Sequence, residues 1–357
     1  MVSQPSPTSV PCLPPLRWDI FCRVIDNLGD AGVCWRLARA LASRGHRVRL
    51  VIDDTTPLQL IAAAGTPGIE VQPWPQVWPA GLRGPGDVVI EAFGCDPPPA
   101  FVDAMVARRP LWLNFEYLSA EPFVERSHGL PSPQPNGLVK TFFFPGFTRL
   151  TGGLLRETDL VLEQAGFDRN AWLSSNGIQL QPGERLVSLF CYDNPALPEL
   201  LRSLAEQPTL LLLTPGPAQQ QVTHGLGALR LHRLPWMSQP EFDRMLWACD
   251  INFVRGEDSL VRALWAGGAL AWQLYPQHDG AHFGKLEALL STTRAPAAVA
   301  GFWRAWNGAP GAAWPGLPPS AVWRDWVQAW RHEMLAQDDL CTRLLAWVRQ
   351  QRLHVGC

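Results

Sequence analysis

INFVRGEDSLVRALWAG, residues Ile251–Gly267, is the stretch of this chain that most constrains its fold. Ile251–Val254 predicts a buried strand, and the apolar run after Ser259 predicts a helix. Between them, Arg255–Ser259 predicts a charged turn broken by a glycine. A helix that follows a strand in this way presents its unpaired N–H groups above the carboxyl edge of the sheet, where anions bind. Because an arginine can grip phosphate with two hydrogen bonds, this stretch predicts a site for a nucleotide diphosphate.

Short apolar strands alternate with helical patterns on both sides of this stretch, and such alternation is typical of parallel α/β sheets. A chain of 357 residues also exceeds one ordinary core, so two domains are expected. The sequence therefore predicts an α/β protein with two Rossmann-like domains facing each other across a cleft. The predicted strands are 18–24, 48–53, 87–92, 111–115, 185–190, 210–214, 229–233, 251–254 and 269–274.

The predicted organisation divides the chain into a tail and two domains. Residues 1–16 are rich in proline and serine and predict a disordered tail. Residues 17–165 predict an N-terminal Rossmann-like domain, ending in a linking helix near 154–165 and completed by C-terminal helices in 321–357. Residues 166–320 predict a C-terminal Rossmann-like domain that contains the predicted diphosphate site. Pro131–Asn136 and Asn307–Pro319 are expected to be loops.

The composition favours a well-packed globular protein, with 47% hydrophobic and 17% charged residues. A net charge of −2 argues against a general nucleic-acid or membrane-surface binder. The chain begins without a basic, apolar leader, and no run approaches the roughly 18 apolar residues of a membrane span. The eight cysteines form no CxxC pair. We therefore expect a cytoplasmic protein that binds neither nucleic acid nor membrane.

An acidic loop, Ile25–Gly32, follows the first predicted strand and precedes a helix predicted from about Val33 to Arg44. Ligands of α/β proteins bind at this edge of the sheet. The loop lacks the GxGxxG spacing of a dinucleotide site, and its aspartates, Asp26 and Asp30, oppose phosphate but suit a cationic partner. The alternative that Asp30 only caps the helix and Asp26 only makes a turn has similar weight on spacing alone.

Aromatic side chains follow the first strand of the second half. Phe190 and Tyr192 stand at its end, and Trp236 and Phe242 lie further along. Such rings stack on a base or sugar, but they pack in cores more often, and the sequence leaves both open. Neither a DxD nor an HExxH motif is present. We therefore expect no metal and no cofactor other than the donor substrate.

Five long blocks together are similar to one family, the protein-arginine rhamnosyltransferases of elongation factor P (the EarP family). The blocks are IDNLGDAGVCWRLARAL (25–41), NFEYLSAEPFVERSHGLPSP (114–133), FFFPGFTRLTGGLLRE (142–157), SLFCYDNPAL (188–197) and NFVRGEDSLVRALWAG (252–267). The resemblance implies a GT-B fold with dTDP-β-L-rhamnose as donor. It assigns acceptor binding to the N-terminal domain, residues 17–165, and nucleotide-sugar binding to the C-terminal domain, residues 166–320. It further implies transfer of rhamnose, with inversion, to one arginine of the translation elongation factor, which activates that factor.

The resemblance also implies roles for individual residues. Asp30 matches the general base, Asp26 its neighbouring catalytic aspartate, and Glu257 an essential glutamate of the donor site. Trp236 stands where the family has an aromatic ring on thymine, whereas Leu28 replaces an expected tyrosine. The other expected donor-binding residues are Arg255, Asp258, Ser259, Phe190, Tyr192 and Phe242.

Three other functions are compatible with parts of the pattern. A GT-B enzyme could use another nucleotide sugar and acceptor, and a non-catalytic protein could bind a nucleotide sugar without turnover. A nicotinamide dehydrogenase is disfavoured because neither half supplies the glycine fingerprint.

Overall fold

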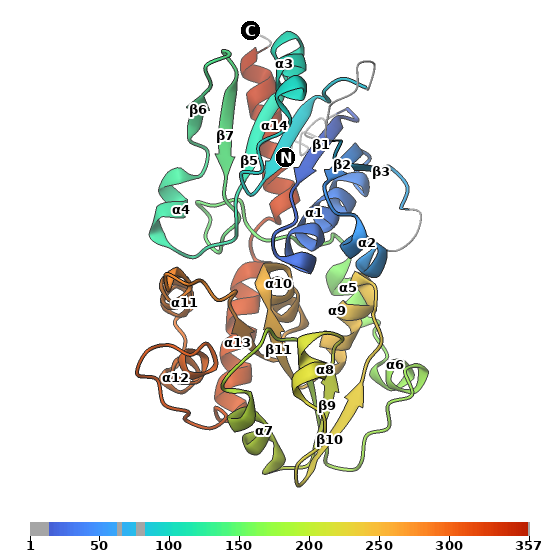
Figure 1. The fold of residues 1–357 in the computed structure, drawn as a ribbon, viewed down its shortest axis with the longest axis vertical. Coiled ribbons are helices and arrows are strands. Elements are labelled where there is room, and N and C mark those ends of the chain that lie inside the picture. Colours follow the sequence, from blue (N-terminus) through green and yellow to red (C-terminus); the bar gives the residue numbers. More distant parts are fainter. Residues whose placement is uncertain (1–13, 63–65, 76–82, 356–357) are drawn as a thin grey trace, which may run out of the picture.

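The computed structural model describes residues 14–62, 66–75 and 83–355. Of the tail predicted over 1–16, residues 1–13 lie outside the described residues. The described chain forms two lobes stacked along the long axis of the molecule (Figure 1). Each lobe is built around one sheet, as the alternating pattern predicts.

The first lobe contains a seven-stranded sheet in the order β3-β2-β1-β4-β5-β7-β6. All of its strand pairs are parallel except β6–β7, which is antiparallel. The central strands are buried on both faces, which explains their mostly apolar sequences. Their two buried carboxylates, Asp19 and Glu91, form ion pairs with Arg49 and Lys140. The strands are β1 (Arg17–Cys22), β2 (Arg47–Ile52), β3 (Ile69–Pro73), β4 (Val88–Ala92), β5 (Leu111–Phe115), β6 (Pro131–Pro133) and β7 (Val139–Phe143).

Helices cover both faces of this sheet. On one face, α1 and α14 share a core with β1, and on the other α3 packs against Phe21 and Trp112. The helices of this lobe are α1 (Asn27–Ala42), α2 (Thr56–Ile61), α3 (Pro99–Arg108), α4 (Pro122–Ser127) and α14 (Leu340–Val355).

The second lobe contains a five-stranded parallel sheet in the order β10-β9-β8-β11-β12. Its strands are β8 (Arg185–Leu189), β9 (Thr209–Leu213), β10 (Leu229–Arg233), β11 (Ile251–Arg255) and β12 (Ala269–Gln273). Its helices are α5 (Leu160–Ala165), α6 (Arg169–Ser175), α7 (Leu197–Ala205), α8 (Pro217–Gln221), α9 (Gln239–Ala248), α10 (Gly256–Ala266), α11 (Ala281–Thr292), α12 (Ala297–Trp306) and α13 (Ser320–Leu335).

The first five strands of each sheet follow the same order, with the first strand of the lobe beside the fourth. Connections leave in opposite directions at this switch point, which opens a crevice at the carboxyl ends of the strands. In the first lobe the switch point lies between β1 and β4, and the chain leaving β1 leads to Asp26. In the second it lies between β8 and β11, and these strands lead to Phe190 and Gly256. The topology thus positions the predicted acidic and phosphate-binding segments.

Two predicted turns are helical instead. Helix α1 begins at Asn27, so most of the predicted loop Ile25–Gly32 is helix, and α10 begins at Gly256 within the predicted turn Arg255–Ser259. Glycines and aspartates weaken isolated helices, but tertiary packing overrides that preference here. Helix α1 packs directly against α2 and α10.

Two other local predictions are also wrong. The predicted linking helix over 154–165 is helical only from Leu160 in α5. Pro131–Asn136, predicted as a loop, contains the edge strand β6, which pairs with β7. Proline is tolerated in an edge strand because its missing N–H can face away from the ladder.

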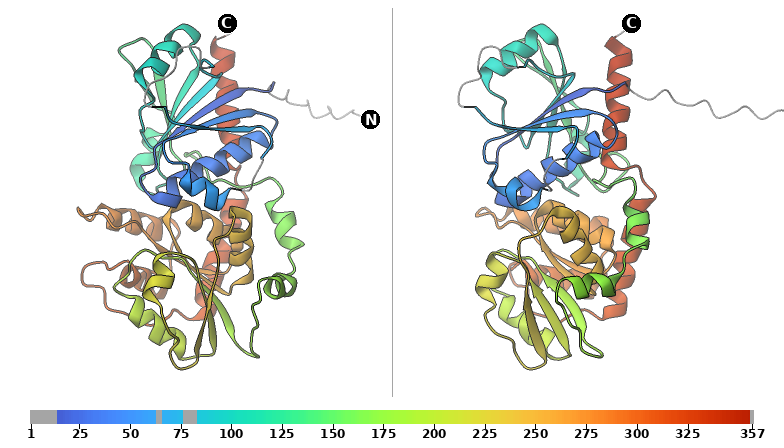
Figure 2. Two further views of the ribbon diagram at one scale, coloured as in Figure 1. Left: turned by 45° about the vertical axis from the view of Figure 1, so that its right-hand side comes forward. Right: turned by 90° about the vertical axis from the view of Figure 1, so that its right-hand side faces the viewer.

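The two C-terminal helices follow each other along one side of the molecule (Figure 2). Helix α14 packs Leu344 and Val348 into the core of the first lobe. Helix α13, which the sequence also assigned to that lobe, packs Trp323 and Trp330 into the core of the second. The apolar periodicity of the two helices does not reveal which lobe each one covers.

Candidate active site

An open pocket of about 740 Å³ lies between the carboxyl edges of the two sheets. The first lobe contributes Asp26, Leu28 and Arg36 to its lining. The second lobe contributes Phe190, Tyr192, Trp236, Gln239, Phe242 and the segment 255–259. The structure thus brings all the predicted site residues to this pocket except Asp30, which does not line it.

Arg255 is held over two aromatic rings. Its guanidinium carbon lies 4.6 Å from the ring centre of Phe190 and 4.4 Å from that of Tyr192. Phe242 packs against Phe190, with the ring centres 5.5 Å apart. Among the described residues, no carboxylate forms an ion pair with Arg255. The rings of Phe190 and Tyr192 therefore hold the guanidinium of Arg255 where it can bind an anion. They are not simply an open surface on which a base or sugar could stack.

Trp236 differs from these rings because 48% of its surface is exposed although it lines the pocket. A large apolar ring exposed in a concave site is suited to stacking on a planar group. The structure is therefore compatible with the stacking role that the sequence proposed for Trp236.

The first turn of α10 enters the pocket through Gly256, whose φ of +69° favours glycine. A Cβ at this position would lie 3.6 Å from Oδ2 of Asp26, so the two lobes approach closely here. No side chain caps the first turn of α10. Its N–H groups, with the nearby hydroxyl of Ser259, are therefore free to bind an anion.

Asp26 is the acidic side chain of the first lobe that faces the pocket. Its Oδ2 accepts a 2.7 Å hydrogen bond from the hydroxyl of Tyr192, which comes from the other lobe. Gly29 leaves room for this carboxylate, because a Cβ there would lie 2.6 Å from the same oxygen. Asp26 also occupies the N-cap position of α1 without capping the helix through its side chain. The alternative that Asp26 is only a turn residue does not account for its contact with the second lobe.

Asp30 lies behind Asp26 and is only 3% exposed. Its Oδ2 accepts 2.8 Å hydrogen bonds from the backbone N–H groups of Ile25 and Asp26, and its carboxyl also bonds to the hydroxyl of Tyr117. Burial raises the pKa of Asp30, although these hydrogen bonds oppose the shift. Asp30 lies in the first turn of α1, so the alternative that it is the N-cap is wrong. It fixes the backbone that carries Asp26.

Glu257 connects the lobes on the other side of the pocket. Its Oε2 accepts a 2.7 Å hydrogen bond from the backbone N–H of Leu118. Burial raises its pKa to about 8, and the charges of Asp30 and Asp26 add to that shift. Lys285 partly opposes it. A glutamate with a pKa of about 8 is mostly protonated at neutral pH.

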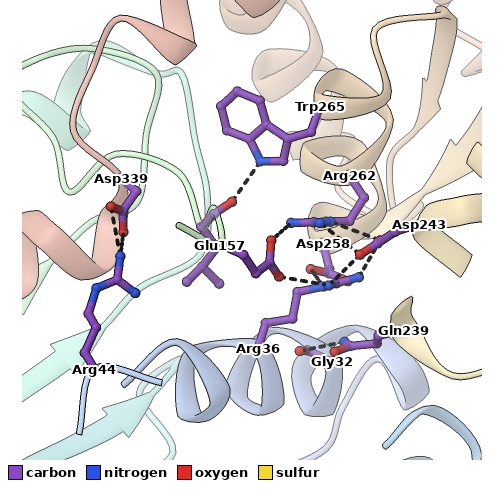
Figure 3. Close-up of polar contacts among 11 residues, drawn as sticks. Gly32, Arg36, Arg44, Glu157, Gln239, Asp243, Asp258, Arg262, Trp265 and Asp339 are labelled. Carbon is purple, nitrogen blue, oxygen red and sulfur yellow. Dashed lines mark hydrogen bonds and ion pairs between the residues drawn. The ribbon is translucent and has the colours of Figure 1, made fainter. Parts of the chain in front are cut away.

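Asp258 lines the pocket, but its charge is paired. Oδ1 lies 2.7 Å from Nε of Arg36 on α1. Arg36 also contacts Asp243 and Glu157, which Arg262 binds as well (Figure 3). Asp258 is expected to contact the donor. In the structure its carboxylate lines the pocket and also forms an ion pair with Arg36 of the other lobe.

Sequence reasoning missed several residues of this region. Arg36 lies inside the quoted block 25–41, but only the tertiary structure reveals its partners. Gln239 donates from Nε2 to the carbonyl oxygen of Gly32 at 3.0 Å, while its buried Oε1 has no partner and the residue lines the pocket. Tyr117 lies in the quoted block 114–133, and Lys285 is one of two lysines in the chain. No motif marked any of the four.

Over residues 14–62, 66–75 and 83–355, no cluster of three or more histidine, cysteine, aspartate or glutamate side chains has the arrangement of a metal site. In the same part of the chain, no helix combines the length and apolar character needed to cross a bilayer.

Two facing parallel α/β sheets with a shared pocket at their carboxyl edges define the GT-B class of glycosyltransferases. The fold of Arabidopsis thaliana UGT89C1 is similar, with a TM-score of 0.53 at 12% identity over 94% of this chain and 99% of that one. The model of the family "Elongation-Factor P (EF-P) rhamnosyltransferase EarP" matches residues 18–349, and the chain belongs to this family.

Named relatives agree with this membership. The protein-arginine rhamnosyltransferase of Pseudomonas putida is 47% identical over 93% of this chain and 98% of its own length. A solved structure that concerns the structural basis for EarP-mediated arginine glycosylation of translation elongation factor EF-P is 35% identical, with a TM-score of 0.63. The match covers 94% of this chain and 99% of that one.

Proposed function

We propose that this chain transfers L-rhamnose from dTDP-β-L-rhamnose to the side chain of one arginine of EF-P, with inversion at the anomeric carbon. As a member of the EarP family, the chain is a protein-arginine rhamnosyltransferase whose acceptor is EF-P. The observation that supports the mechanism best is the meeting of opposite charges at one pocket. Asp26 lies on one side and the ring-supported Arg255 on the other.

The donor binds the second lobe in this proposal. Trp236 stacks on the thymine, and Arg255, Ser259 and the first turn of α10 bind the diphosphate. Gln239 contributes its unpartnered amide oxygen, which can accept a hydrogen bond from the imide N–H of a thymine. The positive charge of Arg255 and the N–H groups of α10 balance the leaving diphosphate in place of a metal ion.

The acceptor guanidinium enters from the side of Asp26 and Asp30. A guanidinium has a pKa above ~12 and an aspartate one near ~4, so prior proton transfer costs on the order of 11 kcal/mol at about 1.36 kcal/mol per unit. The carboxylates therefore clamp the guanidinium first and localise electron density on one nitrogen. The acceptor displaces the hydroxyl of Tyr117 from the carboxyl of Asp30. The bond from the acceptor nitrogen to the anomeric carbon then forms as the bond from that carbon to the diphosphate oxygen breaks, dTDP leaves with the electron pair, and the proton moves to Asp30.

We assign the remaining features as follows. Residues 17–159 with α14 form the acceptor domain, and residues 160–320 with α13 form the donor domain, because α5 packs Leu160 into the core of the second lobe. The carboxyl group of Glu257 keeps its hydrogen bond from the backbone N–H of Leu118 and forms another with the bound sugar. The protein acts in the cytoplasm, where translation factors are found.

Intact-mass analysis of purified EF-P, incubated with this protein and dTDP-rhamnose, tests the reaction. We expect a gain of one deoxyhexose, located on an arginine by fragmentation. Release of dTDP without modified EF-P would favour another acceptor, and binding without release would favour a non-catalytic binding protein. Asp30→Asn keeps the size and polarity of the side chain. Near-normal turnover of this variant would remove Asp30 from the role of base.

A further inference from the structure

A buried group of five charged side chains joins the two lobes beside the pocket. This junction cluster consists of Arg36, Glu157, Asp243, Asp258 and Arg262 (Figure 3). The side chains of both arginines are only 2% exposed. Only Arg36 comes from a helix of the first lobe, since α9 and α10 carry Asp243, Asp258 and Arg262.

All three nitrogens of the Arg36 guanidinium contact carboxylates of the second lobe or of the segment that links the lobes. Nη1 and Nη2 donate to the two oxygens of Asp243 at 3.0 and 2.8 Å, and Nε donates to Asp258 at 2.9 Å. A third carboxylate, Glu157, lies 3.4 Å from Nη1. Such planar, two-pronged pairing fixes orientation as well as distance.

Arg262 has a different set of partners. It binds both oxygens of Asp243, at 3.0 and 2.8 Å, and Glu157 at 2.7 Å. It has no ion pair with Asp258, whose only ion-pair partner among the described residues is Arg36. Arg262 of the second lobe therefore neutralises Asp243 and Glu157 even without Arg36. Asp258, in contrast, depends on Arg36 of the first lobe for its ion pair.

The ion pair between Arg36 and Asp258 joins the two helices that carry the two halves of the active site. Arg36 lies on α1, the helix whose first turn contains Asp30 and whose N-cap is Asp26. Asp258 lies in the first turn of α10, next to Glu257. A helix rises about 1.5 Å per residue and is stiff over this length, so a tilt of α1 against α10 moves the aspartates relative to the donor site.

We propose that Arg36 is a positioning residue of the transfer reaction, which sets Asp26 and Asp30 at the working distance from the donor site through its pairs with Asp258 and Asp243. This inference rests on the proposed function, because it concerns the same pocket. Arg36 touches neither reacting atom in this proposal. A misplacement of about 1 Å between reacting groups can cost roughly 100-fold in rate. A change in the orientation of α1 is therefore expected to lower kcat measurably.

The test compares three variants of the full chain. Arg36→Met removes the connection. Arg36→Met combined with Asp243→Asn also removes the connection but restores the net charge of the junction cluster, because one cation and one carboxylate are lost together. The matched control is Arg44→Met. Arg44 lies just beyond the C-terminal end of α1 and binds Asp339 at 2.9 and 3.0 Å, apart from the junction cluster (Figure 3). It does not line the pocket.

Three quantities are measured for each variant: kcat for EF-P at saturating donor and acceptor, Kd for dTDP by calorimetry, and Tm. A buried carboxylate that has lost its partner destabilises the fold, so Arg36→Met is expected to lower Tm. The double variant is expected to recover part of that loss, because the charge of Arg262 then faces two carboxylates, Glu157 and Asp258, instead of three. Its kcat is nevertheless expected to stay 10- to 100-fold below that of the wild type, with Kd for dTDP changed less than threefold. The control keeps kcat within twofold.

Recovery of kcat together with Tm in the double variant would contradict the proposal, because the role of Arg36 would then be stability alone. A rise of Kd for dTDP in step with the loss of kcat would also contradict it, since Arg36 would then act on the donor site. If Arg36→Met does not fold, the kcat and the Kd for dTDP of the double variant test the proposal. Absence of rhamnose transfer by the wild type would instead contradict the proposed function, so the two failures are distinguishable.

Discussion

The hydroxyl of Tyr192 provides a sharp test of how the second lobe acts on the acidic residue of the first. It donates a 2.7 Å hydrogen bond to Asp26, and burial together with Asp26 raises the pKa of Tyr192, so the hydroxyl stays a donor at any working pH. Tyr192→Phe removes this bond but keeps the ring beneath Arg255. The substitution therefore separates orientation of the carboxylate from binding of the diphosphate.

The size of the effect follows from the type of bond. A hydrogen bond to a charged group contributes about 1.5–3 kcal/mol, and tenfold in rate corresponds to about 1.4 kcal/mol. Tyr192 is 9% exposed, so water does not easily replace its hydroxyl. We expect kcat for EF-P to fall roughly 10- to 100-fold, while Kd for dTDP changes little.

The assay combines steady-state transfer to EF-P, followed by mass, with calorimetric titration of dTDP. Tyr192→Leu serves as the contrasting variant, because it also removes the ring and is expected to weaken dTDP binding. In a double-mutant cycle with Asp26→Asn, the variant lacking both groups should be no slower than Asp26→Asn alone, since the hydroxyl acts through that carboxylate. Additive losses, or a kcat of Tyr192→Phe within twofold of the wild type, would refute this reasoning.

Three further predictions concern the donor half of the pocket. Arg255→Met removes a charge-assisted contact of about 1.5–3 kcal/mol and should raise Kd for dTDP roughly 10- to 150-fold, whereas exposed Arg244→Met should leave it unchanged. Trp236→Ala should weaken dTDP binding by about 1–3 kcal/mol, the usual loss of a stacked base, and an unchanged Kd would remove Trp236 from the site. Because the pKa of Glu257 in the folded protein is about 8, above its ordinary value of 4.5, folding favours its protonated form, and the stability this contributes is lost as pH rises through that interval. The Tm of the wild type should therefore fall more between pH 5.5 and 8 than the Tm of Glu257→Gln, and equal slopes would argue against the raised pKa.

The sequence by itself determined the local elements of this protein and their chemistry. Leu111–Phe115 and Leu229–Arg233 are strands with the predicted bounds. The first is a short, mostly apolar run, as a buried parallel strand requires, whereas the second alternates leucine with arginine and histidine and lies at the edge of its sheet. The order of strands and helices likewise fixed the α/β class. The quoted blocks identified the family, because long specific motifs carry more information than any single spacing.

The tertiary structure decided the starts of α1 and α10. Asp, Gly and Asn favour turns in an isolated chain. At the start of α1, however, Asp26 accepts a hydrogen bond from Tyr192 of the second lobe, and in the first turn of α10 Glu257 accepts one from Leu118 of the first lobe. No local sequence pattern contains these contacts. It also decided that α13 covers one sheet and α14 the other.

The tertiary structure further decided what the candidate site residues touch. Phe190 and Tyr192 support Arg255, Asp30 anchors the backbone before α1, and Asp258 pairs with Arg36, 222 positions away in the chain. Charge and ring character can be read from sequence, but the partner of a buried charge is set by which helices pack together. That packing exists only after both sheets have formed and their carboxyl edges have met.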